Sequence, residues 1–526
     1  DVLHNLGQLH MRQGAYAAAG PLLNEALRLR EKAKDEVTRI AQSHRALCKL
    51  SLNQQEITEA LKHSLEAVKL LKAQATTLEA QDVLASLHFD LGQIYVLTDH
   101  AKEAEEELNL ALNQWRKLQK KLDCREKMAM AHDQLGLLYT KQGNGEQAFL
   151  NLRAATAILR ALSATFPRVK TYKQELATAL VHLGNLHRAS KQNDLALSTY
   201  LEAQLLRQKL AQSEPENPIY REELAAVLNN RGIAYRDDGN FKKAEIFYKQ
   251  ARQHRQALVD LDPKSRRYQS ELAGSYLNLG EMQYRQAKLA ESKESLQKAL
   301  DLYGPLVKQN STWSGAHQGL ASAHLNMGQV MFGMKNAKEA LTHFTKSTQM
   351  LSRVWNPEKS SVDVLTLYQN SLSGRIVGLI KAERHSEALA DLEILEKISG
   401  DLPWEIPILH ASTLARLGKH REAVERIQKS EKSPIQTPNA VVKRAAVWSL
   451  AYQAVQGDPA LNDAERNRFL ADYCDRAVTL LRRAFSNEQF AKDKANLKLF
   501  SSTDFKPIRE EQKFKDLIVE VRKILG

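Results

Sequence analysis

The feature that most constrains this chain is a repeat with a fixed period of 48 residues between positions 172 and 328. Residues of one type recur in register along this stretch. The clearest series is formed by glycines, namely Gly184, Gly232, Gly280 and Gly328. Further series are Tyr172, Tyr220 and Tyr268; Glu175, Glu223 and Glu271; and Ala177, Ala225, Ala273 and Ala321. A period of this length indicates stacked repeats, in which each unit packs only on its neighbours.

Composition indicates that the stacked units are helical. The 526 residues include only 13 prolines and 23 glycines, and aromatic residues make up 6%. Ala, Leu, Gln, Glu, Lys and Arg, which favour helix, dominate the remainder. A chain of this length would normally divide into several globular domains. A solenoid is the exception, because its core grows lengthwise as units are added.

Each unit carries small residues at regular spacing on two helices, which we call helix A and helix B. Helix A has a Leu-Gly pair with an aromatic residue three positions later, and helix B has two Ala positions with a large residue between them. We call the helix A glycine position the Gly slot. One well-preserved unit reads Leu135-Gly136, Tyr139, Ala148, Leu152 and Ala155. This spacing resembles the tetratricopeptide repeat (TPR), in which the small residues let helices A and B cross closely.

The TPR resemblance predicts an all-α fold, a right-handed α-solenoid of about ten TPR-like helix hairpins. The long period and the prolines that recur with it predict long B helices that end at proline-marked turns. We divide the chain into residues 1–355, with eight units; 356–432, with degenerate TPR units; and 433–526, with a helical hairpin and a C-terminal cap.

A narrower resemblance lies in the repeated Tyr-x-x-Glu-Leu-Ala segment and in the end of the chain. These segments are Tyr172-Lys173-Gln174-Glu175-Leu176-Ala177, Tyr473-Cys474-Asp475-Arg476-Ala477-Val478 and Phe505-Lys506-Pro507-Ile508-Arg509. They are similar to the C-terminal TPR regions of large bacterial serine/threonine protein kinases. That resemblance implies a signalling protein with a kinase domain upstream, often followed by a membrane span.

The first residue, Asp1, is not a methionine and falls inside an expected helix, so we expect a fragment of a longer protein. On this view the protein is cytoplasmic, or is tethered to a membrane through residues upstream of this segment. ATP and Mg would bind only to the implied kinase domain.

Catalytic motifs are not visible in the sequence. A Gly-rich phosphate loop, a His-Arg-Asp triplet, an Asp-Phe-Gly triplet and an HExxH motif are all missing. Cys48, Cys124 and Cys474 are far apart, and we expect them to be buried thiols. We therefore expect no catalytic residue, no metal and no cofactor in this segment. Three histidines at one helix A position, four residues before the Gly slot, are expected to pack rather than to bind ligands; they are His88, His132 and His324.

A row of polar residues stands two positions before the Gly slot. Its members are Asn5, Asp90, Gln134, His182, Asn230, Asn278 and Asn326. This position lies on the side of helix A turned away from helix B, which would line the concave groove of the superhelix. Amides there can donate to and accept from the backbone of an extended peptide. We predict Gln134, His182, Asn230, Asn278 and Asn326 as groove residues; the alternative is that they bond to neighbouring helices.

A second row stands four positions after the Gly slot, about one helical turn along. It contains Arg188, Arg236, Tyr284 and Phe332, with Arg285 adjacent. Arginine beside aromatic rings suits acidic or aromatic-anchored segments of a partner. The alternative for each residue is a solvated rim. Together the two rows predict a protein-interaction scaffold that binds a peptide or a partner helix.

The charge of the chain allows a different class of function. The formal net charge is +13 and the isoelectric point is about 9.3, so a basic solenoid could bind nucleic acid or an anionic surface. The 75 basic and 62 acidic residues are interspersed, however, and no dense basic tract with interleaved aromatics occurs. We therefore do not expect nucleic acid as a partner. No apolar run in this segment is long enough to span a bilayer.

Overall fold

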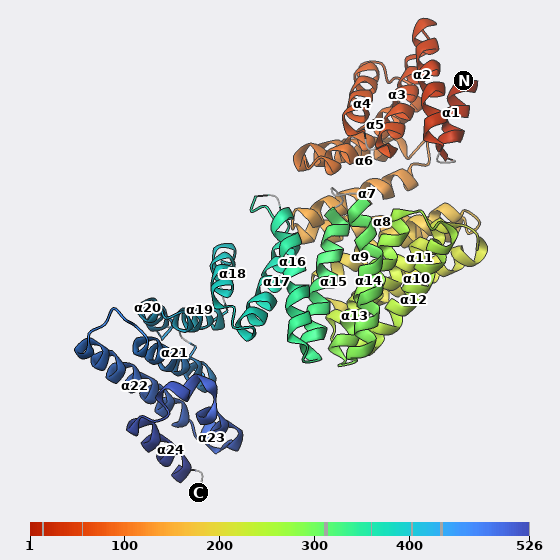
Figure 1. Ribbon diagram of the computed structural model, residues 1–526. Helices are drawn as coiled ribbons and strands as arrows, with labels where there is room; N and C mark the ends of the chain where they lie inside the picture. Colours follow the sequence, from red (N-terminus) through yellow and green to blue (C-terminus); the bar gives the residue numbers. More distant parts are fainter. Residues whose placement is uncertain are drawn as a thin grey trace. The chain divides into compact units, whose positions relative to one another are not determined.

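The computed structural model describes residues 1–12, 15–54, 56–309, 314–358, 360–400, 403–431 and 435–524 (Figure 1). It contains two compact units, Asp1–Pro263 and Lys264–Gly526. The described residues form α-helices and two 3₁₀ helices, and no strand occurs among them. Of these helices, none combines the length and the apolar character needed to cross a membrane.

In the first unit, each odd-numbered helix packs against the even-numbered helix that follows it. The odd-numbered helices are the predicted A helices and the even-numbered ones the B helices. The hairpins are α1 (Val2–Arg12) with α2 (Tyr16–Lys32), α3 (Val37–Asn53) with α4 (Ile57–Leu71), α5 (Leu78–Leu97) with α6 (Ala101–Leu118), α7 (Arg125–Lys141) with α8 (Gly145–Thr165), α9 (Lys170–Ala189) with α10 (Asn193–Ser213), and α11 (Pro218–Asp237) with α12 (Phe241–Leu261).

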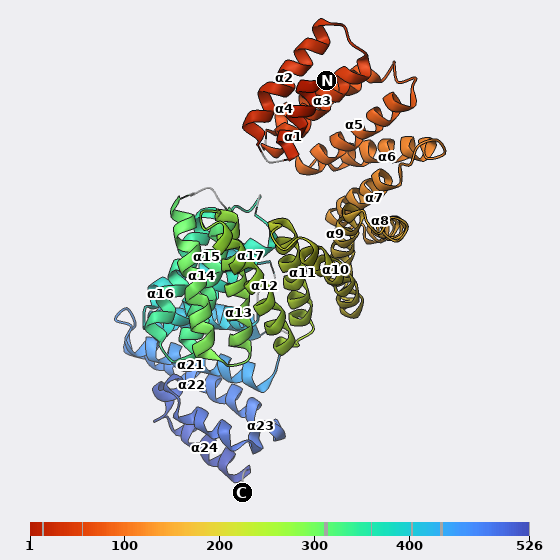
Figure 2. The same ribbon diagram turned by 90° about the vertical axis from the view of Figure 1, so that its right-hand side faces the viewer.

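The second unit continues the same pairing, and α13 to α16 lie side by side in both views (Figure 2). Its hairpins are α13 (Arg266–Arg285) with α14 (Leu289–Gln309), α15 (Ser314–Gly333) with α16 (Ala337–Val354), α17 (Val362–Lys381) with α18 (His385–Ile398), α19 (Glu405–Arg416) with α20 (His420–Glu431), and α21 (Pro438–Gln456) with α22 (Asp463–Phe485). The last elements are α23 (Glu488–Lys492), η1 (Lys494–Ser501), η2 (Thr503–Ile508) and α24 (Gln512–Ile524).

These hairpins confirm the predicted all-α solenoid of stacked helix pairs. The division into 1–355, 356–432 and 433–526 rests on how well the repeat is preserved, and it stays a prediction. Residues 432 and 433, where its last boundary was placed, lie outside the described residues.

The Gly slots face helix B, as the spacing predicts. A Cβ atom added at Gly136 would lie 2.5 Å from Leu152 Cγ, and one added at Gly232 would lie 2.5 Å from Tyr248 Cε1. Leu152 and Tyr248 are fully buried. Gly184 and Gly280 make the equivalent approach to Tyr200 and Leu296, at 2.6 Å. The crossing of helices A and B therefore leaves no room for a side chain at this position.

The turn from helix A to helix B needs one residue in the left-handed backbone region, seven positions after the Gly slot. Glycine occupies this position at Gly143 and Gly239, both with φ of 74°. Other repeats place a residue with a side chain there, and these are Asp99 (65°), Lys191 (59°), Ala287 (59°), Lys335 (63°) and Glu383 (58°). Left-handed φ is strained for such residues, so the stacking of the hairpins must hold these turns in place.

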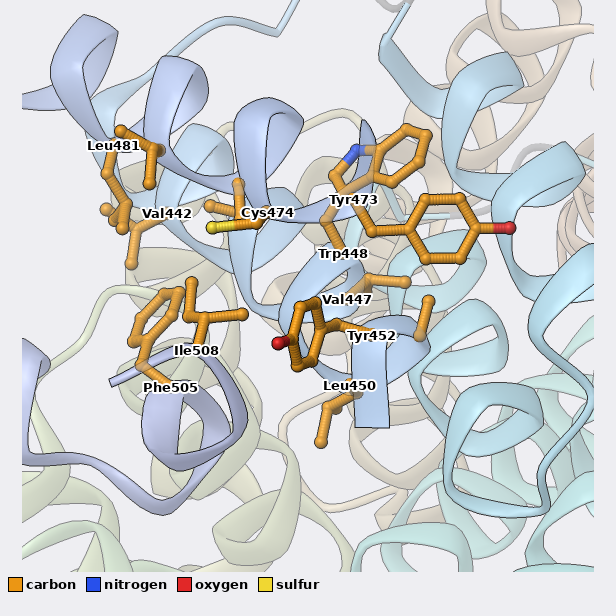
Figure 3. Packing of buried hydrophobic residues seen from close by; sticks show 14 of the residues in the cluster. Val442, Val447, Trp448, Leu450, Tyr452, Tyr473, Cys474, Leu481, Phe505 and Ile508 are labelled. Atoms are coloured by element: carbon orange, nitrogen blue, oxygen red, sulfur yellow. The ribbon is translucent and has the colours of Figure 1, made fainter. Parts of the chain in front are cut away.

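The C-terminal core joins α21, α22 and η2 (Figure 3). Trp448 is fully buried, and its Nε1 donates to Glu431 Oε1 at 2.8 Å. The ring of Tyr473 packs against the ring of Trp448 at a centroid distance of 5.3 Å. Phe505 and Ile508 of η2 cover the same cluster, so the last segment closes the apolar face of the final hairpin. The three cysteines are buried thiols, as expected.

Substituting the Gly slot should show how tight the crossing is. We expect Gly136→Ala to lower the free energy of unfolding by about 1–2 kcal/mol, because the added methyl group overpacks Leu152. Gly145→Ala in the same hairpin is the control. A Cβ at Gly145 meets nothing within 4 Å, so this variant should be neutral or more stable by about 0.5 kcal/mol. Denaturant unfolding of the two variants measures the difference, and equal stability would contradict the close crossing.

The strained turns give a prediction of opposite sign. Ala287→Gly should raise the free energy of unfolding by about 0.5–1 kcal/mol, because glycine adopts a φ of 59° without strain. Ala290→Gly, at an exposed position three residues further on in α14, should destabilise the chain instead. Thermal unfolding of both variants checks this; a destabilised Ala287→Gly variant would contradict the account of the turn.

Candidate functional site

The side of helix A that faces away from helix B carries the predicted site residues. Each helical residue turns by about 100°, so a position two before the Gly slot lies about 200° from the glycine. Because the glycines face helix B, the side chains of the polar row point away from it. We call this side the helix A surface.

Three amides of the polar row have no bonding partner on this surface. Gln134 on α7, Asn230 on α11 and Asn326 on α15 are half-buried, and none of them makes a hydrogen bond to another described residue. Asn278 on α13 is also half-buried, but it has an interaction within the protein. An amide that keeps its donors and its acceptor available can bond to a ligand.

His182 behaves differently from the amides. Its Nδ1 lies 2.8 Å from Asp133 Oδ1 and 3.0 Å from Asp133 Oδ2. Asp133 is on α7, the helix A of the preceding repeat. At this member of the row, the structure shows the alternative that the sequence left open, a bond to a neighbouring helix.

Similar polar bridges join consecutive A helices elsewhere in the first unit. Each connects residues 45 or 49 positions apart, close to the repeat period. They are Arg45 Nε to Asp90 Oδ2 (2.6 Å), Lys127 Nζ to Asp82 Oδ1 (2.7 Å), Gln174 Nε2 to Glu223 Oε1 (3.1 Å) and Arg188 Nη1 to Asp237 Oδ2 (2.9 Å). The helix A surface is therefore partly used to hold neighbouring repeats together.

The arginines of the second row share one acidic partner. Arg188 Nη1 and Arg236 Nη2 each lie 2.9 Å from a carboxylate oxygen of Asp237. Their side chains keep about a third of their surface exposed, at 33% and 31%. The pair can still meet a ligand, but Asp237 offsets part of their charge.

The aromatic members of the second row pack into the core of the second unit. Tyr284 and Phe332 are partly buried against the cluster that contains Leu325 and Val330. The Nζ atom of Lys381 lies 4.1 Å from the centroid of the Phe332 ring. Arg285 is exposed and bridges to Glu281, one turn earlier in α13, at 2.9 Å.

A cavity of about 330 Å³ lies in the first unit between the A helices α5, α7 and α9 and is also lined by Leu159 of α8. It brings the predicted residue Gln134 together with the His182 partner Asp133. The walls combine apolar, amide and hydroxyl side chains with one further carboxylate. The lining residues are Phe89, Gln93, Ala129, Met130, Asp133, Gln134, Leu159, Thr171, Gln174, Glu175, Thr178 and Ala179.

Glu175 is the member of this cavity that the site prediction missed. Its Oε2 atom is buried and has no hydrogen-bond partner. Burial, then the charge of neighbouring Glu126 and a side-chain hydrogen bond with it, raise the pKa of Glu175 to about 7. The sequence signal was the series Glu175, Glu223 and Glu271, but the period alone does not distinguish these glutamates from one another.

The recurring histidines contact helix B of their own hairpin. Each Nδ1 lies within hydrogen-bond distance of the residue 19 positions later. The pairs are His44 with His63 (3.0 Å), His88 with Glu107 (2.5 Å), His132 with Asn151 (2.8 Å) and His324 with His343 (3.0 Å). These contacts confirm packing within hairpins. Throughout the part of the chain that the structure describes, no group of three or more His, Cys, Asp or Glu residues could hold a metal.

The His324–His343 pair predicts a pH dependence of stability. Burial, followed by the charges of His343 and Lys346, lowers the pKa of His324 to about 4. The unfolded chain, with an ordinary histidine pKa near 6.5, binds the proton more readily, so stability is present above about pH 6.5 and is lost as the pH falls towards 4. His324→Leu removes this term; Leu180 and Leu228 hold the same position in other repeats.

We expect the wild type to lose about 1–2 kcal/mol more than His324→Leu between pH 7 and pH 4.5. Denaturant titrations of both proteins at each pH measure this difference, and other titrating groups cancel in the comparison. An equal loss of unfolding free energy in the two proteins would contradict the lowered pKa of His324.

The hairpins and the helix A surface define a helical-repeat solenoid of the protein-interaction class. Family models described as tetratricopeptide repeat match residues 1–33, 224–262 and 273–304. TPR repeats therefore occur in both units of the chain. No curated protein sequence matches the chain.

Solved structures of three other proteins are similar to parts of this chain. BtubC (BKLC) from P. vanneervenii is 22% identical, with 46% of this chain and 90% of that chain covered and a TM-score of 0.38. PilF from Pseudomonas aeruginosa is 17% identical, covering 55% and 96%, with a TM-score of 0.34. A tetratricopeptide repeat protein from Parabacteroides merdae is 14% identical, covering 66% and 98%, with a TM-score of 0.33. At these values nothing about function follows from the likeness.

Proposed function

We propose that this chain is a protein-interaction scaffold that holds an extended peptide or a partner helix on the helix A surface. The observation that carries the proposal is a set of half-buried amides that have no bonding partner among the described residues, namely Gln134, Asn230 and Asn326. The TPR matches support it, because stacked helical repeats provide extended surfaces that bind other proteins.

The chemistry of the amides fits a peptide backbone. An amide offers a donor and an acceptor at one point, and the backbone of an extended peptide presents both at regular intervals. Half-burial in a helix restricts the side chain before binding, so less conformational entropy is lost when the ligand arrives. Each bond to the ligand contributes about 0.5–1.5 kcal/mol.

The second row supplies side chains for specificity within this proposal. Arg188, Arg236 and Arg285 keep exposed guanidinium surface that can meet an acidic residue of the partner. Tyr284 and Phe332 contribute the exposed parts of rings whose other parts pack in the core. His182 acts through its bond to Asp133, a residue that lines the same cavity as Gln134.

We further propose, from the sequence resemblance alone, that the scaffold is the regulatory or substrate-recruiting region of a bacterial serine/threonine protein kinase. The kinase domain would lie upstream of Asp1 and would hold ATP and Mg, while this segment would need no cofactor. The protein would be cytoplasmic or tethered to a membrane through those upstream residues. The sequence of the gene upstream of Asp1 tests this directly, since a kinase domain either is or is not encoded there.

Binding of nucleic acid or of an anionic surface is not favoured. Much of the described surface charge is arranged as pairs one turn apart on a single helix, such as Lys298 with Glu294 and Lys429 with Glu425, both at 2.7 Å. A surface of alternating sign presents no extended basic track for phosphates.

Amide substitutions test the scaffold. Peptides that bind the full chain are selected from a randomised display library, and their affinities are measured by titration. We expect the triple variant Asn230→Ala, Asn278→Ala and Asn326→Ala to weaken binding by about 10- to 160-fold, because each of the three lost bonds contributes about 0.5–1 kcal/mol. The helix content from circular dichroism should stay unchanged.

The matched control removes three exposed amides from B helices, with Asn24→Ala, Asn113→Ala and Gln297→Ala. This control should bind the selected peptides like the wild type. Because the three site amides are divided between two units, the single variants show which unit holds each peptide. Unchanged affinity of the triple variant, or an equal loss in the control, would exclude the proposed amides as the site.

A further inference from the structure

Two consecutive interfaces of the first unit can be compared position by position, because they are related by the 48-residue period. At the interface of α9, α10 and α11, Arg207 of α10 is buried. Its Nη2 donates to Thr178 Oγ1 of α9 at 2.6 Å, and its Nη1 forms an ion pair with Glu223 of α11. A buried cation therefore joins the two A helices and compensates the recurring glutamate.

At the preceding interface the cation is missing. The residues 48 positions earlier are Leu159, Met130 and Glu175. All three line the 330 Å³ cavity between α5, α7 and α9. Neither Leu159 nor Met130 can donate a hydrogen bond to a carboxylate, and the buried Oε2 of Glu175 is left without a partner. The cavity thus occupies the place at which the next repeat buries a guanidinium group.

The charge around this cavity also lacks a compensating group. Glu126 is the strongest charged neighbour of Glu175 and also shares a side-chain hydrogen bond with it, and Asp133 is a further acidic neighbour; the charges of both repel the ionised form of Glu175. The nearby imidazole of His182 bonds to Asp133. The α5 wall contributes Phe89 and Gln93, which carry no charge. A buried carboxyl with acidic neighbours is the environment in which an incoming cation gains the most.

We propose that this cavity receives the guanidinium or ammonium group of an arginine or lysine side chain of a peptide partner. The cationic group would bond Glu175 as Arg207 bonds Glu223, and the stem of the side chain would lie against Met130, Leu159 and Phe89. This inference rests on the proposed function and adds the chemistry of one anchoring residue. The net charge of +13 does not attract a basic partner, so recognition depends on the cavity.

Matched peptide libraries test the proposal with the full chain. Three libraries carry arginine, lysine or citrulline at one fixed position and random residues around it; citrulline has nearly the shape of arginine without its charge. We expect the arginine and lysine libraries to bind at least tenfold more tightly than the citrulline library. Glu175→Gln should remove this preference, whereas Glu146→Gln, at an exposed carboxylate of α8, should keep it.

A second variant fills the cavity from inside. Leu159→Arg recreates the arrangement of Arg207 and Glu223, so it should also abolish the preference for cationic peptides. Circular dichroism shows whether this variant folds, and Glu175→Gln tests the same point without adding bulk. Agmatine, a free guanidinium compound, serves as the probe that needs no peptide, and its binding is followed by thermal shift.

The outcomes separate this inference from the proposed function. Preference for arginine and lysine that is lost in Glu175→Gln supports the cavity as their site. Peptides that bind equally with arginine and citrulline leave the scaffold function standing and overturn the cavity proposal. Stabilisation by agmatine through Glu175, with no binding of any library, overturns a peptide occupant and also the proposed function.

Discussion

The close crossing of helices A and B at the Gly slot is the constraint on which the rest of this structure depends. At Gly136, Gly184 and Gly232 the facing side chain of helix B lies where a Cβ atom would be. Leu152, Tyr200 and Tyr248, which fill this space, are fully buried. The crossing fixes which side of helix A is hidden, and therefore which side is left to meet the next repeat or a ligand.

The helix A surface serves two purposes that compete for the same positions. His182 is used to join neighbouring A helices through Asp133, whereas Gln134 and Asn230 have no described partner. Arg207 and Leu159 hold equivalent positions on the B helices α10 and α8 and show a related choice, since Arg207 completes its interface and Leu159 leaves the Oε2 atom of Glu175 without a partner. Side chains that do not bond to the next repeat are available to a ligand, so these positions are where a repeat protein can acquire a binding site.

Sequence reasoning succeeded at positions where the local backbone or packing allows only a few residue types. The glycines of the slots were readable because few other residues fit those positions. The turns at Lys191 and Ala287 were not readable, because their left-handed φ is imposed by the stacked hairpins and not by the residue itself. Tyr284 and Phe332 were predicted at a groove and lie partly in the core, since periodicity does not tell how far a neighbouring hairpin covers a ring.

The sequence by itself determined the hairpins, their period and the two sides of each A helix, because small and large residues a few positions apart control how one hairpin packs. Only the tertiary structure decided which polar side chains on the helix A surface are bonded. These contacts join residues almost one period apart, such as Asp133 and His182. They depend on how one repeat stacks on the next, and that geometry also created the cavity beside Glu175.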